Sequence, residues 1–207
     1  MHRIEVAGGT ATFMQADVSV ESEVAGLVDG AMHTYGCLDA TVNNAGAELP
    51  VTIADSDAAG FAAVIATNLE GMRACLKHEI RVMRSSGGGS IVNMSSVTSD
   101  LTAAPRNGLD GATKGGVDAL TKVAVVEVAK DGININALAF IGADVENGMF
   151  QRFLAATGLS QDQILSAIPV GRLLSAAELC AAVRYLTSEA RFMTGTTVVL
   201  DGGYTAL

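Results

Sequence analysis

The sequence predicts an α/β fold in which helices cover both faces of a doubly wound parallel sheet. Short apolar runs that suit buried strands alternate with longer segments of helical periodicity. Strands that alternate with helices form βαβ units with parallel strands. The composition agrees, because 49% of the residues are hydrophobic and only 17% are charged, as in sheets that are buried on both faces. With 207 residues and no internal repeat or linker, we expect one domain over residues 1–207.

The first elements are predicted from a strand-like run and a capping pattern. Residues 11–16 (ATFMQA) predict a strand. Ser19 is the expected N-cap of a helix over 20–35, since Glu21 then falls in the first turn, where acidic side chains are favoured.

The later elements follow from the same patterns. The strands are short runs rich in Val, Ile and Leu, bounded by Gly or Asn, and the helices are longer segments with apolar residues three or four apart. In chain order we expect a strand over 38–42, helices over 56–66 and 68–85, a strand over 90–94, a helix over 112–130, a strand over 133–138, a helical excursion over 143–168, a helix over 176–187 and a strand over 197–200. We predict five parallel strands in the order 11–16, 38–42, 90–94, 133–138, 197–200.

A candidate site lies where the strand over 90–94 ends and the next helix begins. Ser96 follows that strand, and Lys114 lies in an early turn of the helix, so both should reach the carboxyl edge of the sheet, where such folds bind ligands. Asp110 precedes Lys114 by one helical turn, and we expect an i,i+4 ion pair that keeps the aspartate ionised.

Charge and composition limit the partners. A net charge of −9 argues against nucleic acid and anionic membranes. The sequence has no signal-peptide pattern and no apolar run of membrane-spanning length. Cys37, Cys75 and Cys180 form no paired motif, so we expect reduced thiols and a cytoplasmic protein. The three histidines lack metal-ligand spacing, so we predict no metal site.

Several motifs, in order along nearly the whole chain, resemble those of the short-chain dehydrogenase/reductases, which have a Rossmann-like fold. Asp17 is similar to the family's adenine-contacting aspartate, and Asn44, Ala45 and Gly46 belong to a segment similar to its Asn-Asn-Ala-Gly motif beside the cofactor. The carboxyl-terminal segment from Thr194 to Gly203 also resembles the family signature.

The resemblance also implies catalytic roles. Asn68 corresponds to the asparagine that kinks a helix and holds a water of the proton relay. Ser96 corresponds to the serine that bonds the substrate carbonyl, and Lys114 to the lysine that binds ribose. The family's catalytic tyrosine, four residues before that lysine, is here Asp110.

The chain departs from the family in two further places. The family's glycine-rich phosphate turn and first βαβ unit have no counterpart. The family's Pro-Gly after a later strand is Phe140-Ile141, and its following threonine has no clear counterpart in residues 142–146.

Three functions remain open at this point. Our leading hypothesis is a non-redox structural subunit that binds no nicotinamide cofactor and forms a homo-oligomer, or a hetero-oligomer with a paralogue. The helices over 68–85 and 112–130 carry apolar stripes that suit either such an interface or the protein's own sheet. The first alternative is a cofactor-free isomerase, dehydratase or cyclase, in which Ser96, Asp110 and Lys114 act on an apolar small molecule covered by residues 143–168. The second is an NAD(P)-dependent oxidoreductase whose amino-terminal segment is missing from this chain.

Overall fold

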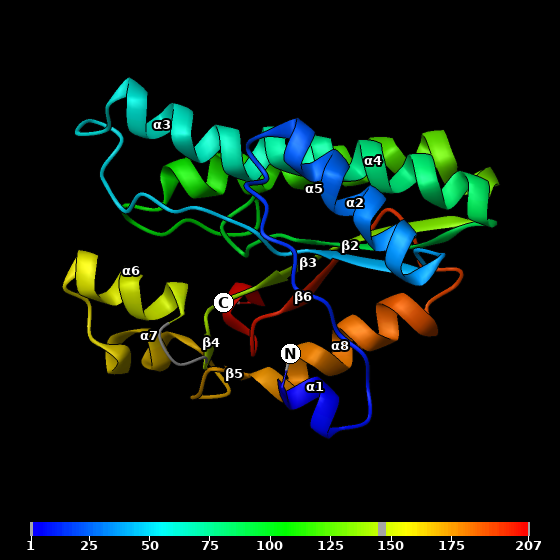
Figure 1. Ribbon diagram of the computed structural model, residues 1–207. Coiled ribbons are helices and arrows are strands. Elements are labelled where there is room, and N and C mark those ends of the chain that lie inside the picture. Colours follow the sequence, from blue (N-terminus) through cyan, green and yellow to red (C-terminus); the bar gives the residue numbers. More distant parts are fainter. Residues whose placement is uncertain (1, 145–147, 207) are drawn as a thin grey trace.

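A four-stranded parallel sheet forms the centre of the molecule. The computed structural model describes residues 2–144 and 148–206 (Figure 1). The strands lie in the order β1-β2-β3-β6. They span Ala40–Asn43 (β1), Gly89–Met94 (β2), Ile133–Phe140 (β3) and Thr197–Leu200 (β6). The predicted α/β class and the predicted order of these four strands are confirmed.

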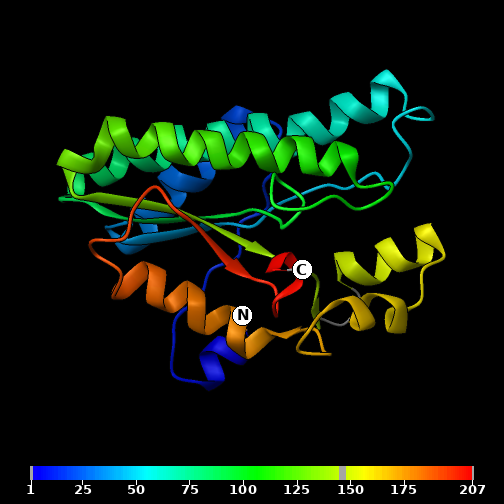
Figure 2. The same ribbon diagram turned by 180° about the vertical axis from the view of Figure 1, so that it is seen from behind.

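Helices cover both faces of this sheet, as Figures 1 and 2 show. One face carries α2 (Glu21–Tyr35), α3 (Ala58–Ile65), α4 (Gly71–Ser86) and α5 (Gly108–Val128). A π-helix, Ala66–Glu70, joins α3 to α4. The other face carries α8 (Ala176–Ser188).

The segment predicted as a helical excursion forms a small unit beside the carboxyl end of the sheet. It contains β4 (Ala143–Asp144), α6 (Met149–Thr157) and α7 (Gln161–Ala167), and β4 pairs with β5 (Leu174–Ser175). Residues 145–147, within the segment where a family threonine was sought, lie outside the described residues.

Neighbouring residues of β2 point into separate halves of the core. Ile91 packs with Met72 and Val117 under α4 and α5, whereas Val92 packs with Leu186 under α8. This alternation is expected for a strand that is covered on both faces. The apolar stripes of α4 and α5 therefore contribute to the protein's own core, which is the second of the two roles that the sequence allowed.

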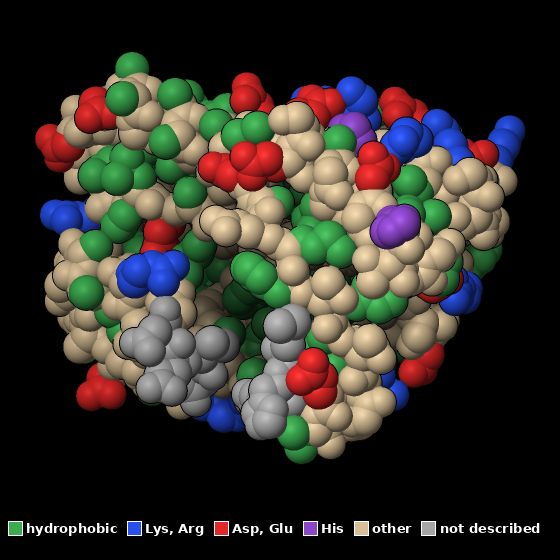
Figure 3. Space-filling view, in the orientation of Figure 1, with side chains coloured by type: hydrophobic (Ala, Val, Ile, Leu, Met, Phe, Trp, Pro, Cys, Tyr) green, Lys and Arg blue, Asp and Glu red, His purple; other side chains and the backbone are tan. Residues whose placement is uncertain are grey.

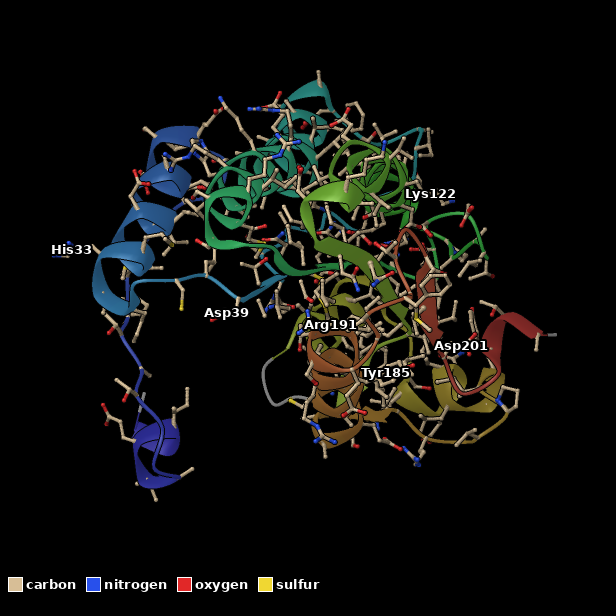
Figure 4. The ribbon with its side chains drawn as sticks, turned by 90° about the vertical axis from the view of Figure 1, so that its right-hand side faces the viewer. His33, Asp39, Lys122, Tyr185, Arg191 and Asp201 are labelled. Carbon is tan, nitrogen blue, oxygen red and sulfur yellow. The ribbon has the colours of Figure 1, made fainter. Side chains whose placement is uncertain are left out.

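The predicted strand over residues 11–16 is wrong, and so is the five-stranded sheet. These residues form an extended connection without strand pairing, and Phe13 is 72% exposed. A strand requires a hydrogen-bonded neighbour, but the described residues give β1 only β2 as a partner. Its other edge is open. Figure 4 shows this connection leading away from α2 to α1 (His2–Val6), which stands clear of α8.

The expected cap of α2 is also wrong. Val20 occupies the N-cap position, and its side chain makes no capping hydrogen bond. The hydroxyl of Ser19 instead donates to Oδ1 of Asp17 at 2.7 Å, because this local turn competes with the cap.

A hollow of about 330 Å³ lies between α2, β1 and α4. Its walls are mostly apolar and include Val18, Val28, Leu38 and Val42. The open edge of β1 therefore borders a space that a further chain segment could enter. None of the described helices is both long and apolar enough to cross a membrane.

Candidate active site

Asn68 fixes the loop that follows β1. It lies in the π-helix, a local widening often found at functional sites, and is 2% exposed. Its Oδ1 accepts a hydrogen bond from the Ala47 backbone N–H at 2.7 Å, and its Nδ2 donates to the Ala47 carbonyl at 2.9 Å. One side chain thus satisfies both polar groups of Ala47 and holds the loop against α4 and α5.

The amide of Asn68 also faces the first turns of α5. Its Nδ2 lies 3.0 Å from Oγ1 of Thr113 and 3.3 Å from Oδ1 of Asp110. An amide nitrogen has two hydrogens, but with Ala47 it has three acceptors here. The bond to Asp110 is the longest of the three, so the Asp110 carboxyl is the least firmly held.

Asp110 lies in the first turn of α5 and is 8% exposed. Burial raises the pKa of its carboxyl, while the charge of Lys114 acts in the opposite direction. The two side chains do not form the expected ion pair, because the Lys114 ammonium is engaged elsewhere. The expected ion pair with Lys114 is therefore absent, and burial outweighs the effect of the lysine charge, so the pKa of Asp110 lies above its ordinary value.

Lys114 points from α5 to the end of β2. Its Nζ donates to the Met94 carbonyl at 2.8 Å. Burial lowers the pKa of this ammonium, and the charges of Asp110 and Asp118 oppose that effect. A Cβ on Gly46 would lie 3.9 Å from this Nζ and 3.6 Å from Oδ1 of Asn68. Lys114 and Asn68 therefore meet at Gly46, where a Cβ would be in van der Waals contact with both.

Ser96 reaches this cluster through a chain of hydroxyl and amide groups. Its Oγ lies 2.9 Å from Oγ1 of Thr98, which also accepts a hydrogen bond from Nδ2 of Asn107 at 3.0 Å. Asn107 immediately precedes α5, and its side chain helps to lower the pKa of Asp110. The structure thus connects Ser96 with the start of the helix that carries Asp110 and Lys114.

Sequence reasoning missed Glu48. Its side chain is 13% exposed, and its Oε1 lies 4.0 Å from Nε of Arg152 on α6. Burial and the charge of Asp110 raise the pKa of Glu48 to about 6, with burial the larger cause and Arg152 acting against it. In the sequence, only the position of Glu48 two residues after Gly46 indicates that it lies near the candidate site.

The predicted cofactor residues lie on the neighbouring hollow. Asn44 and Ala45 line it, together with Val18. Asp17 precedes Val18, and its carboxylate accepts hydrogen bonds from the N–H and hydroxyl of Ser19, which lower its pKa. Among the described residues no group of three or more His, Cys, Asp or Glu side chains could hold a metal ion. The face seen in Figure 3 is hollowed near its centre, where hydrophobic side chains are gathered.

A doubly wound parallel sheet with polar side chains at the carboxyl ends of its strands defines a Rossmann-like protein. A family model described as enoyl-(acyl carrier protein) reductase matches residues 1–205. The cis-4-hydroxycyclohexanecarboxylate dehydrogenase of Sinomonas cyclohexanicum is 36% identical over 97% of this chain and 79% of its own. The chain belongs to the short-chain dehydrogenase/reductase family.

Further relatives agree with this assignment. The 2,5-dichloro-2,5-cyclohexadiene-1,4-diol dehydrogenase of Sphingobium indicum is 33% identical over 99% of this chain and 82% of its own. A gluconate 5-dehydrogenase from Burkholderia cenocepacia, solved with NADP and tartrate, superposes with a TM-score of 0.90 at 29% identity, covering 100% of this chain and 80% of that one. ElxO with NADP bound gives a TM-score of 0.86 at 33% identity, covering 95% and 79%.

These relatives contradict our leading hypothesis. Dehydrogenases and NADP complexes among the similar proteins point to an oxidoreductase with a nicotinamide cofactor, not to a non-redox structural subunit without one. The same findings favour the oxidoreductase alternative over the cofactor-free isomerase, dehydratase or cyclase. Asp110 stands at the family's tyrosine position, but Asn68 and Lys114 still lie together at the end of β2.

Proposed function

We propose that the protein is an NAD(P)-dependent oxidoreductase that interconverts a hydroxyl group and a carbonyl group. The observation that carries this proposal is the meeting of Asn68 and Lys114 at Gly46, next to the end of β2. Two relatives named above act, by their names, on hydroxylated six-membered rings. We therefore expect a cyclic alcohol, or the corresponding ketone, as the substrate.

The residues present fit the nicotinamide end of such a cofactor. An ammonium has three donors, and Lys114 uses one for Met94, which leaves two for the ribose hydroxyls. Asn44 and Ala45 border the adjoining hollow. We assign the substrate oxygen to Ser96, and Asp110 corresponds in sequence to the family's proton-donating tyrosine. A bound nicotinamide supplies or accepts the hydride.

The pyrophosphate end needs a segment that the described residues do not contain. We propose that a glycine-rich strand–turn–helix outside these 207 residues pairs with the open edge of β1 and enters the hollow beside it. The relatives support this proposal. Nearly all of this chain aligns with them, but the alignment covers only about four-fifths of the length of each relative. Phosphate groups bind at a helix N-terminus that follows such a turn.

We further propose a cytoplasmic homo-oligomer, or a complex with a paralogue. An apolar groove along α4 and α5, lined by Leu69, Leu120 and Val123 among others, suits such contacts. Val123 is exposed beside it.

Binding of the four nicotinamide dinucleotides to the protein made from its complete coding region tests the function. A ligand that binds the folded state raises the melting temperature by mass action. We expect either NAD+ and NADH or NADP+ and NADPH to bind at micromolar concentration. The oxidised form of the pair that binds should support oxidation of cyclic alcohols. No binding up to millimolar concentration would overturn the proposal.

A further inference from the structure

Glu48 is an acid whose backbone is held at the candidate active site. It directly follows Ala47, whose N–H and carbonyl both bond to Asn68. Because Asn68 also faces Asp110, the loop that carries Glu48 is fixed relative to α5. On its other side lies α6, whose Met149 Cε would be 3.7 Å from a Cβ on Gly46.

The Glu48 carboxyl has an oxygen without a hydrogen-bond donor. Oε1 is buried and, within the part of the chain that the structure describes, accepts no hydrogen bond. Among the described residues, the charged groups that shift its pKa are Arg152 from α6, 4.0 Å away, and Asp110 from α5. A buried acceptor left unbonded costs about 1–3 kcal/mol, so such an atom calls for an explanation, and a catalytic role is one. A substrate hydroxyl is a donor of the required kind.

We propose that Glu48 exchanges the proton with the substrate hydroxyl in this active site, and that Asp110 acts on it as a positioning residue. This inference rests on the proposed oxidoreductase function. In alcohol oxidation, the hydride leaves the carbinol carbon for an oxidised nicotinamide dinucleotide, and the hydroxyl proton passes to the Glu48 carboxylate as the C=O bond forms. Carbonyl reduction runs in reverse, with protonated Glu48 as the donor.

Glu48 suits this role better than Asp110 for two reasons. A general acid or base works best when its pKa lies near the working pH, and the pKa of Glu48 is raised to about 6 by burial and by Asp110. Asp110 has a shorter side chain and already lies against the amide of Asn68. The negative charge of Asp110 raises the pKa of Glu48, so Glu48 keeps its proton to higher pH.

The first test needs no cofactor. Carboxyl NMR titration of the ligand-free protein should place the Glu48 pKa near 6, well above the ~4.3 of an exposed glutamate. Asp110→Asn should lower that pKa, because it removes a neighbouring negative charge, and Arg152→Ala should raise it. A Glu48 pKa that is ordinary in the wild-type protein, or unchanged in Asp110→Asn, would overturn the pairing.

The second test uses the active protein. Glu48→Gln should lower kcat by about 10²–10⁴-fold and remove the inflection near pH 6 from its pH profile, while the dinucleotide Kd stays the same. Glu48→Asp should keep an inflection at reduced kcat, and Glu127→Gln, an exposed carboxyl on α5, should match the wild type.

The outcomes separate the two proposals. An active wild type whose kcat and pH profile survive in Glu48→Gln would sink the role of Glu48 and leave the oxidoreductase standing. A wild type that binds none of the dinucleotides would instead remove the proposed function, on which this role depends. Far-UV circular dichroism and the melting temperature of Glu48→Gln show whether a loss of activity is a loss of fold.

Discussion

Asn43 donates a hydrogen bond from Nδ2 to Oε2 of Glu79 at 3.0 Å, which joins the end of β1 to α4 inside the core. The same Nδ2 lies 3.0 Å from Oδ1 of Asn93 on β2, and Asn93 in turn donates to Oγ1 of Thr121 on α5 at 2.9 Å. A polar chain thus links two strands and two helices within otherwise apolar surroundings. Glu79 is 5% exposed, and burial raises its pKa to about 7.

Glu79 should make the stability of the protein depend on pH. Its folded-state pKa of about 7 exceeds the ordinary value of 4.5 for a glutamate, so between these pH values the folded state holds a proton that the unfolded state has lost. The free energy of unfolding should therefore fall as pH rises through this window, by about 3 kcal/mol at ~1.4 kcal/mol per pKa unit. Urea denaturation of wild type and Glu79→Gln at several pH values measures the effect. Glu79→Gln should flatten the curve, and equal slopes in the two proteins would contradict the prediction.

Asn68→Ala should destabilise the protein and loosen the loop after β1. The change removes the partners of both backbone groups of Ala47, at roughly 1 kcal/mol for each hydrogen bond. We expect a loss of about 2–4 kcal/mol in urea denaturation and faster proteolysis within residues 47–57. Asn134→Ala is the matched control, because its amide makes one bond, to the Ala190 carbonyl. Equal losses in the two variants would rule out the proposed clamp.

Gly88→Ala should be far more harmful than Gly87→Ala. Both glycines have positive φ, at 110° and 91°. A Cβ on Gly88 would lie 2.4 Å from the Gly132 carbonyl oxygen, whereas a Cβ on Gly87 meets nothing within 4 Å. We expect about 1 kcal/mol of destabilisation for Gly87→Ala from its backbone conformation and at least ~2 kcal/mol more for Gly88→Ala from overpacking. Similar midpoints in urea for the two variants would show that the strand can shift.

Gly26→Ala should stabilise the protein. Gly26 is an exposed position inside α2, and a Cβ there meets nothing within 4 Å. Alanine in a helix interior is favoured over glycine by about 0.5–1 kcal/mol. Gly30→Ala in the same helix should gain less, because its Cβ would lie 2.7 Å from Sδ of Met14. Urea denaturation measures both changes. An equal rise in the free energy of unfolding for Gly30→Ala and Gly26→Ala would contradict the close contact between position 30 and Met14.

Lys114→Met should weaken cofactor binding with little effect on the fold. Methionine preserves most of the side-chain length but removes the donor to Met94 and the two donors assigned to ribose. Thermal shift with saturating dinucleotide should show a smaller rise in melting temperature than in wild type. Lys122→Met, on an exposed turn of the same helix (Figure 4), is the control. Wild-type affinity in Lys114→Met would contradict the assigned role.

The predicted elements succeeded where pattern and packing agree. Strand 197–200 matched β6, and the helix over 20–35 matched α2 to within one residue. The run over 11–16 failed because its residues alone resemble a strand, while strand formation depends on an available neighbour. The π-helix leaves no mark in composition, since it differs from an α-helix only in its hydrogen-bond spacing.

The motifs identified Asn68, Lys114 and Gly46, which lie together in the structure, while their catalytic and cofactor-binding roles stay predictions. The electrostatics of the site could not be predicted from the sequence. The predicted Asp110–Lys114 ion pair was wrong because i,i+4 spacing does not reveal that Lys114 donates to the Met94 carbonyl. Nor does it reveal that burial raises the pKa of Asp110 by more than the charge of Lys114 lowers it. Glu48 was missed because its burial depends on α6, a hundred residues along the chain.

Each pairing in the sheet joins residues that are distant along the chain. Ala40 faces Ser90, Ile91 faces Ile135, and Leu138 faces Val198. Three long loops must therefore close before the sheet exists, and parallel sheets built from such contacts fold slowly. During that interval the edges of the inner strands are as unpaired as the outer edge of β1, and unpaired strand edges are where two chains can pair with each other.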